Sequence, residues 1–101
     1  MTELIFNGTP ITALPAWVAE CTSLKQLVLS NTKIVEPPDV SALVNLERLY
    51  LNECDQLRAL PDVSANENLY DFRAPKHLEA CLPDYLIEGR QALIHLISSS
   101  L

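Results

Sequence analysis

The chain has 101 residues, of which 49% are hydrophobic, 20% charged and 6% aromatic. This composition predicts one globular domain with a mainly aliphatic core, and it excludes a disordered chain, which would contain fewer apolar residues. The formal net charge of −6 disfavours nucleic acids and anionic membranes as partners, because phosphates repel carboxylates, and it slightly favours a basic protein partner.

Pairs of apolar residues separated by one position recur along the chain. The pairs, in chain order, are Leu4 and Phe6, Leu27 and Leu29, Leu49 and Leu51, and Phe72 and Ala74. Their first members stand at positions 4, 27, 49 and 72, so successive steps are 23, 22 and 23 residues. Such a regular step is typical of a repeat protein. The approximate repeats are 1–23, 24–45, 46–68 and 69–83.

Each pair predicts a short β-strand with one buried face. In Leu49-Tyr50-Leu51 the two leucines should point inward and the tyrosine outward, because successive side chains of a strand alternate between faces. One repeat cannot bury its own leucines, so it needs neighbours above and below. The expected fold is therefore an α/β architecture, a short solenoid of about four parallel strands.

The end of the chain has the pattern of an amphipathic helix. Pro83 and Asp84 favour a first helical turn, and Leu86, Leu93 and Ile97 follow at helical spacing. We therefore expect residues 84–101 to form a C-terminal capping helix over the fourth repeat. No comparable cap precedes the first strand, which suggests the hypothesis that two copies pair through their first repeats.

The fuller repeat pattern resembles a known family. The second repeat contains Leu24-xx-Leu27-x-Leu29 followed by Ile34, and the third contains the same pattern and ends in Leu60-Pro61. This pattern resembles the leucine-rich-repeat family in its short form, as found in plant disease-resistance receptors and bacterial effectors. The resemblance extends from about residue 4 to residue 83. The family's asparagine position is filled instead by Thr9, Thr32, Cys54 and His77.

The resemblance implies a protein–protein interaction module rather than an enzyme, with no cofactor and with the concave sheet face as the binding surface. The residues predicted to bind a protein partner are those that the strands should turn outward: Ile5, Val28, Tyr50, Arg73, Gln26, Arg48, Asn52 and Asp71. Ordinary cross-strand packing is an equally good interpretation of the central column of these residues.

Two other functions are compatible with the pattern. The first is a structural subunit that assembles, for example as a homodimer, through its uncapped first repeat. The second is a repeat fragment of a larger bacterial effector or ubiquitin-ligase-like protein, because some bacterial repeat proteins carry a separate ligase domain.

Cys54 and His77 stand one repeat step apart and could in principle form a nucleophile and its base or part of a metal site. We favour a structural role, because this position of the repeat points inward and ties the turn after the strand to backbone. We therefore predict no catalytic or metal-binding residues. For Asp39 and Asp62, which follow prolines, we favour capping of a local turn. Trp17 is expected to shield the first repeat.

The cysteines suggest a compartment. Cys21, Cys54 and Cys81 include no closely spaced pair and cannot all form disulfides within one chain. The sequence has no segment resembling a signal peptide and no apolar run long enough to span a membrane. A cytoplasmic location is therefore expected, and secretion as an effector is the alternative.

Overall fold

The computed structural model describes residues 2–81 and the side chains up to residue 78. Its four strands have three residues each: β1 (Glu3–Ile5), β2 (Gln26–Val28), β3 (Arg48–Tyr50) and β4 (Asp71–Arg73). Two 3-10 helices accompany them, η1 (Ala16–Glu20) and η2 (Lys76–Cys81). The predicted capping helix at 84–101 lies outside the described residues, so its existence stays a prediction.

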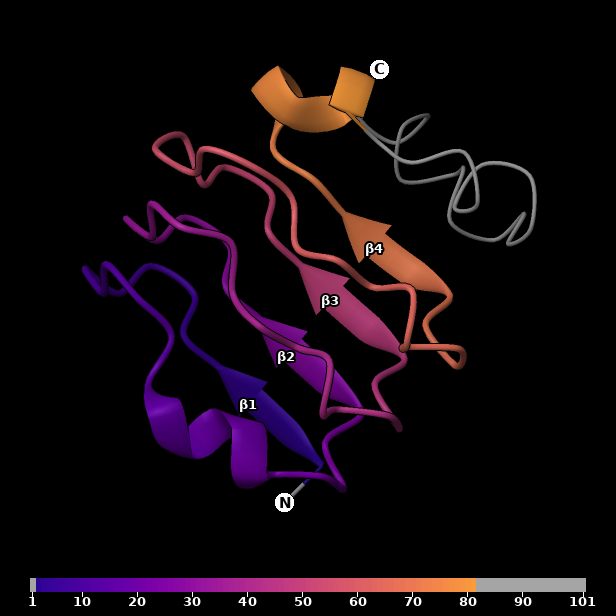
Figure 1. The fold of residues 1–101 in the computed structure, drawn as a ribbon. Helices are drawn as coiled ribbons and strands as arrows, with labels where there is room; N and C mark the ends of the chain where they lie inside the picture. The colour runs from indigo at the N-terminus through magenta and orange to yellow at the C-terminus, as the bar shows by residue number, and fades with distance from the viewer. Residues whose placement is uncertain (1, 82–101) are drawn as a thin grey trace.

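The strands form one parallel sheet in the order β1-β2-β3-β4, so neighbours in sequence are also neighbours in space (Figure 1). The register repeats without a slip. Leu4 pairs with Leu27, Leu27 with Leu49, and Leu49 with Phe72. The apolar pairs of the sequence therefore mark the strands correctly, including the weak fourth pair, and the parallel sheet of an α/β repeat fold is present with almost no helix.

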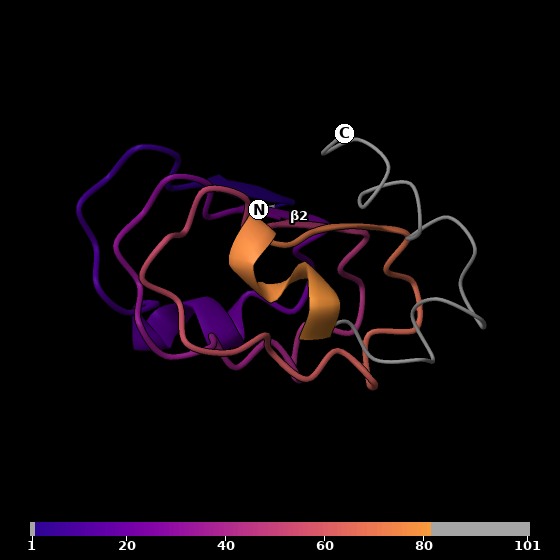
Figure 2. The ribbon, with the colours of Figure 1, turned by 90° about the horizontal axis from the view of Figure 1, so that it is seen from above.

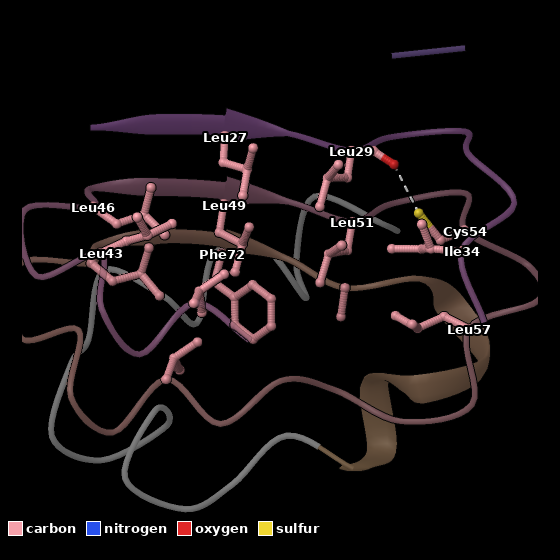
Figure 3. Close-up of a cluster of buried hydrophobic side chains, with 14 of the residues drawn as sticks. Leu27, Leu29, Ile34, Leu43, Leu46, Leu49, Leu51, Cys54, Leu57 and Phe72 are labelled. Carbon is pink, nitrogen blue, oxygen red and sulfur yellow. Dashed lines mark hydrogen bonds between the residues drawn. The ribbon is translucent and has the colours of Figure 1, made fainter. Parts of the chain in front are cut away.

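The core lies under one face of this sheet (Figure 3). Its largest fully buried member among the described residues is Phe72, and most of the others are leucines, including Leu27 of β2 and Leu49 of β3. Phe72 of β4 lies below Leu27 and Leu49 in the same column. Burying each such side chain is worth about 1.5–3 kcal/mol in transfer free energy, so this column is the main stabilising feature of the fold.

The chain returns on the side opposite the strands, as seen along the stack in Figure 2. Val18 of η1 and its counterparts Val40 and Val63 are fully buried there. Before two of these turns, the carboxylates of Asp39 and Asp62 each accept a hydrogen bond from the backbone N–H two residues later, at 3.1 and 2.9 Å. The predicted capping role of these two aspartates is thus confirmed.

The turns after the first three strands share a left-handed residue. Gly8, Asn31 and Glu53 have φ of 77, 55 and 63°, and they occupy equivalent places in successive repeats. Only glycine adopts this conformation without a steric penalty, and asparagine tolerates it better than glutamate does. The equivalent residue of the fourth repeat is Lys76, where η2 begins, so the turn geometry changes there.

The first repeat is the least buried. Leu4 and Phe6 pack against the core yet stay partly exposed. The indole of Trp17 lies beside the Phe6 ring, with 6.4 Å between ring centroids, and remains 48% exposed. Trp17 therefore covers part of the first apolar layer, as expected, without closing it.

Candidate protein-interaction surface on the parallel sheet

The sheet face turned away from the core carries seven of the eight predicted binding residues, and the eighth, Asn52, lies in the turn that follows β3. We call this face of the sheet the outer sheet face. Two columns of side chains run across the four strands, perpendicular to the strand direction. The first consists of Ile5, Val28, Tyr50 and Arg73, and the second consists of Glu3, Gln26, Arg48 and Asp71. Both columns follow from the alternation of side chains along strands whose other face carries the core leucines. The structure brings these seven predicted residues together on one surface, and whether they bind a partner stays a prediction.

At the β1 and β2 end of the outer sheet face, the column of Ile5 and Val28 is apolar, whereas the neighbouring column holds Glu3 and Gln26. Ile5 is 61% exposed, whereas Val28 is only 8% exposed because neighbouring strands flank it on both sides. Ile5 lies on the edge strand and is covered on one side only. An incoming apolar side chain would therefore gain most of its contact area from Ile5.

The β3 and β4 end carries an aromatic and ionic cluster. The Tyr50 hydroxyl donates a hydrogen bond of 2.8 Å to Asp71 Oδ2, and Arg73 Nε lies 3.4 Å from Asp71 Oδ1. The Arg73 guanidinium lies over the Tyr50 ring, with Cζ 4.4 Å from the ring centroid. Asp71 is buried, so its charge is tolerated because both neighbours satisfy it.

Arg48 of β3 and Tyr70, which precedes β4, form a second arginine–tyrosine pair on this face. Arg48 Nε donates a hydrogen bond of 2.8 Å to the Tyr70 hydroxyl, and its Cζ lies 5.6 Å from the centroid of the Tyr70 ring. The hydrogen bond to the Tyr70 hydroxyl raises the pKa of the Arg48 guanidinium. Burial, followed by the hydrogen bond to Asp71, raises the pKa of the Tyr50 hydroxyl above its ordinary value.

The remaining predicted residues lie at the two margins of the face. Gln26 lines a shallow hollow of about 280 Å³ at the amino ends of the strands, beside Lys25 and Glu47. Asn52 follows β3, and its side-chain oxygen accepts a hydrogen bond of 2.7 Å from Ser30 Oγ. Gln26 therefore faces a polar depression, whereas Asn52 ties two neighbouring repeats together.

Cys54 has a structural environment. Its thiol is fully buried and lies 2.9 Å from the backbone oxygen of Leu29, which also accepts a hydrogen bond from Thr32 Oγ1 at 2.8 Å (Figure 3). His77 Nε2 lies 2.7 Å from a different acceptor, the backbone oxygen of Leu57. The two residues thus have separate partners, and Cys54 ties one repeat to the preceding one as the sequence pattern predicted.

Sequence reasoning missed two groups of side chains. Tyr70 is absent from the predicted binding residues because it precedes its strand, yet its ring lies under the Arg48 guanidinium. Asparagines outside the usual position also link the repeats. Asn45 and Asn68 donate to backbone oxygens of the previous repeat, and buried Asn66 donates to Val40 and Leu43. The shared place of Asn45 and Asn68, one residue before a core leucine, was the available signal.

Comparison with known proteins links the chain to plant resistance proteins. In an alignment of 76 positions that covers 70% of the chain, it is 41% identical to the disease resistance protein RPP4 of Arabidopsis thaliana. It is 48% identical over 44 residues to the protein SUPPRESSOR OF npr1-1, CONSTITUTIVE 1 of the same plant, a match that covers 44% of the chain. The matches span only 6% and 3% of these two proteins. No family model and no solved structure matches the chain.

The comparisons therefore support the predicted resemblance in its coarse form, as a relationship to plant resistance proteins. Within residues 2–81, no helix is both long enough and apolar enough to cross a membrane.

Proposed function

We propose that the chain is a leucine-rich-repeat solenoid that binds a protein partner through the outer sheet face. The observation that carries this proposal is the composition of that face. It combines the most exposed large apolar residue among those described, Ile5, with two guanidinium groups that rest on tyrosine rings. Aromatic and arginine side chains are enriched at the energetic centres of protein interfaces.

The similarity to plant resistance proteins supports a role in interaction or signalling. We propose no catalytic function. The one thiol that stands near a histidine in the repeat pattern, Cys54, is buried and bonded to backbone. A buried thiol without an electropositive neighbour is a poor nucleophile. We also propose that the protein is cytoplasmic, in keeping with Cys21 and Cys54 being free thiols.

The test is selection of binding peptides from a random displayed library of peptides about twelve residues long, followed by affinity measurement on two matched variants. The face variant, Ile5→Asp with Arg48→Glu, changes two exposed residues of the outer sheet face. The control variant, Val44→Asp with Arg58→Glu, makes the same chemical changes at two exposed residues away from it.

We expect the face variant to raise the Kd of the selected peptides by about tenfold or more and the control variant to leave it within about twofold. Peptides that bind both variants equally well, or that lose affinity only on the control variant, would refute the outer sheet face as the binding surface. Circular dichroism of both variants verifies that each is folded.

Self-assembly through the first repeat is a second candidate function. β1 is an edge strand, and Leu4 and Phe6 beside it are partly exposed. A second copy placed against β1 would cover the exposed surface of Leu4 and Phe6. Light scattering after size exclusion, over a concentration series, tests the idea with Leu4→Lys as the disrupting variant. A monomer at all concentrations would reject it.

A further inference from the structure

The two arginines of the outer sheet face are held in the same way. Each guanidinium lies over a tyrosine ring, and each uses its Nε for one contact on the protein, with Tyr70 for Arg48 and with Asp71 for Arg73. For both side chains, the terminal Nη groups have no acceptor among the described residues. The free edge of such a guanidinium carries two parallel N–H donors, which match the two oxygens of a carboxylate.

This arrangement prepares both groups for a ligand. A flexible arginine loses rotamer entropy when it binds, but a ring beneath the guanidinium and a bond at Nε already fix much of the side chain. Arg73 keeps 40% of its side-chain surface exposed and Arg48 is an exposed residue. Both therefore combine preorganisation with access.

The charge of this end of the face differs from that of the whole chain. On the outward positions of β3 and β4, Arg48 and Arg73 contribute two positive charges and Asp71 one negative charge, which leaves one positive charge, while the whole chain carries −6. Asp71 is buried within the cluster and directed at Tyr50 and Arg73, so it does not occupy the free edges. A carboxylate bound here would be recognised by local contacts rather than by long-range attraction.

The position of Ile5 sets a second requirement for the partner, which is the spacing between its apolar side chain and its carboxylate. Ile5 and Arg73 belong to the same column and are three strand steps apart, which is about 14 Å at a strand spacing of about 4.8 Å. An extended peptide covers about 14 Å in about four residues, and a helix does so in about nine. The partner segment should thus present an apolar side chain and a carboxylate at one of these spacings.

We propose that the outer sheet face recognises an acidic peptide segment, whose carboxylates bind the free edges of Arg48 and Arg73 while a neighbouring apolar side chain contacts Ile5. This inference rests on the proposed function and specifies its partner. It is opposite in sign to the expectation from net charge, which slightly favoured a basic partner, because the net charge averages over surfaces that do not take part.

The first experiment repeats the peptide selection on three proteins: the natural chain, Arg48→Gln with Arg73→Gln, and the control Arg58→Gln. Arg58 is also an exposed arginine, but its partner is Glu36 and it lies outside the outer sheet face. We expect Asp and Glu to be enriched by about threefold or more in peptides selected on the natural chain and the control, and to return to library frequency on the double variant.

The possible outcomes separate the two proposals. Peptides that depend on Ile5 but show no acidic enrichment would overturn the acidic-partner inference and leave the proposed function standing. Peptides that ignore the Ile5→Asp with Arg48→Glu variant altogether would overturn the proposed function itself. Enrichment that persists on the double variant would also overturn the inference.

A second experiment needs no variant and so remains valid if a substitution unfolds the protein. The peptide acetyl-Leu-Gln-Gln-Gln-Glu-Glu amide, which carries an apolar side chain and carboxylates at the extended spacing, is titrated into the isotope-labelled natural chain, and the N–H signals of the arginine Nε groups are followed by NMR. The same peptide with both glutamates replaced by glutamine is the matched neutral probe. We expect shifts at Arg48 and Arg73, little change at Arg58, and none with the neutral peptide. Equal shifts at all three arginines, or none at any, would overturn the inference.

Discussion

The first and third repeats have the same apolar pattern, but the structure treats them differently. Leu49 and Leu51 of the third repeat are fully buried, whereas Leu4 and Phe6, at the equivalent places of the first, remain partly exposed. This difference in burial does not come from residue type, because positions 4 and 49 are both leucine. It comes from position, since Leu49 has a strand on each side and Leu4 has one on one side only. Burial in this molecule is a property of the stack.

The largest expected contrast is therefore between core truncations in the two repeats. Leu49→Ala should lower the free energy of unfolding by about 2–5 kcal/mol, because it removes a fully buried side chain and leaves a cavity. Leu4→Ala should cost about half as much or less, since solvent already reaches this residue. Urea unfolding followed by circular dichroism measures both. Equal losses would mean that the first repeat is covered by something in solution.

The threonines at equivalent turn positions, Thr9 and Thr32, allow the first repeat to be compared with an inner repeat through the contribution of a buried hydroxyl to stability. Thr32 Oγ1 donates a hydrogen bond of 2.8 Å to the Leu29 backbone oxygen, whereas the buried Thr9 Oγ1 has no partner among the described residues. Thr32→Val should thus destabilise the protein by about 1 kcal/mol, and Thr9→Val should be neutral or slightly stabilising. Both substitutions preserve shape, so the same unfolding measurement isolates the hydroxyl. A loss at Thr9 equal to that at Thr32 would show that Thr9 has a partner.

The turns after β1 and β3 each contain one residue with a positive φ, so the backbone conformation of the two repeats is alike although their burial differs. Gly8 already suits its φ of 77°, but Glu53 at 63° carries a steric penalty. Glu53→Gly should therefore stabilise by about 0.5–1 kcal/mol, and Gly8→Ala should destabilise by about 1 kcal/mol. A Cβ at Gly8 meets no atom within 4 Å, so the latter effect would be purely conformational. Thermal melts of both variants check the signs.

The smallest expected effect is a pH dependence of the free energy of unfolding that arises from Tyr50, on the outer sheet face of the third repeat. The pKa of Tyr50 is raised in the folded protein, so the folded chain holds this proton over a pH range in which the unfolded chain has lost it. Stability should then fall as pH rises through the ordinary tyrosine value of 10.0 toward the higher folded value. Urea unfolding at about pH 8 and about pH 11 measures this decrease.

Two variants separate the origin of that pH dependence. Tyr50→Phe removes the titrating group, so part of the decrease between the two pH values should disappear. Asp71→Asn retains the tyrosine and removes the neighbouring charge, which is one of the causes of the raised pKa, so it should reduce the decrease without abolishing it. If Tyr50→Phe shows the full decrease, the tyrosine is not its source.

Much of the fold was predictable because the apolar pairs recur along the sequence at a nearly constant interval of 22 or 23 residues. The pairs at 4, 27, 49 and 72 gave all four strands, their order and their inward residues, since a period of two fixes the face and a period of about 23 fixes the neighbour. The same alternation placed the residues of the outer sheet face on one surface. Val40 and Val63, which lie opposite the strands and are buried, also stand one repeat step of 23 residues apart.

Tertiary structure alone decided how these side chains are used. Residues 21 or 22 positions apart in sequence, such as Tyr50 and Asp71 or Arg48 and Tyr70, meet only when the repeats are stacked, and the exact contacts depend on rotamers that no pattern specifies. Thus Asp71 became a buried carboxylate between Tyr50 and Arg73, and Tyr70 became the support of Arg48. The sequence by itself determined which residues share a face. The stack determined which of them are satisfied by neighbours and which remain open to a partner, because burial and hydrogen bonding depend on the repeats on either side.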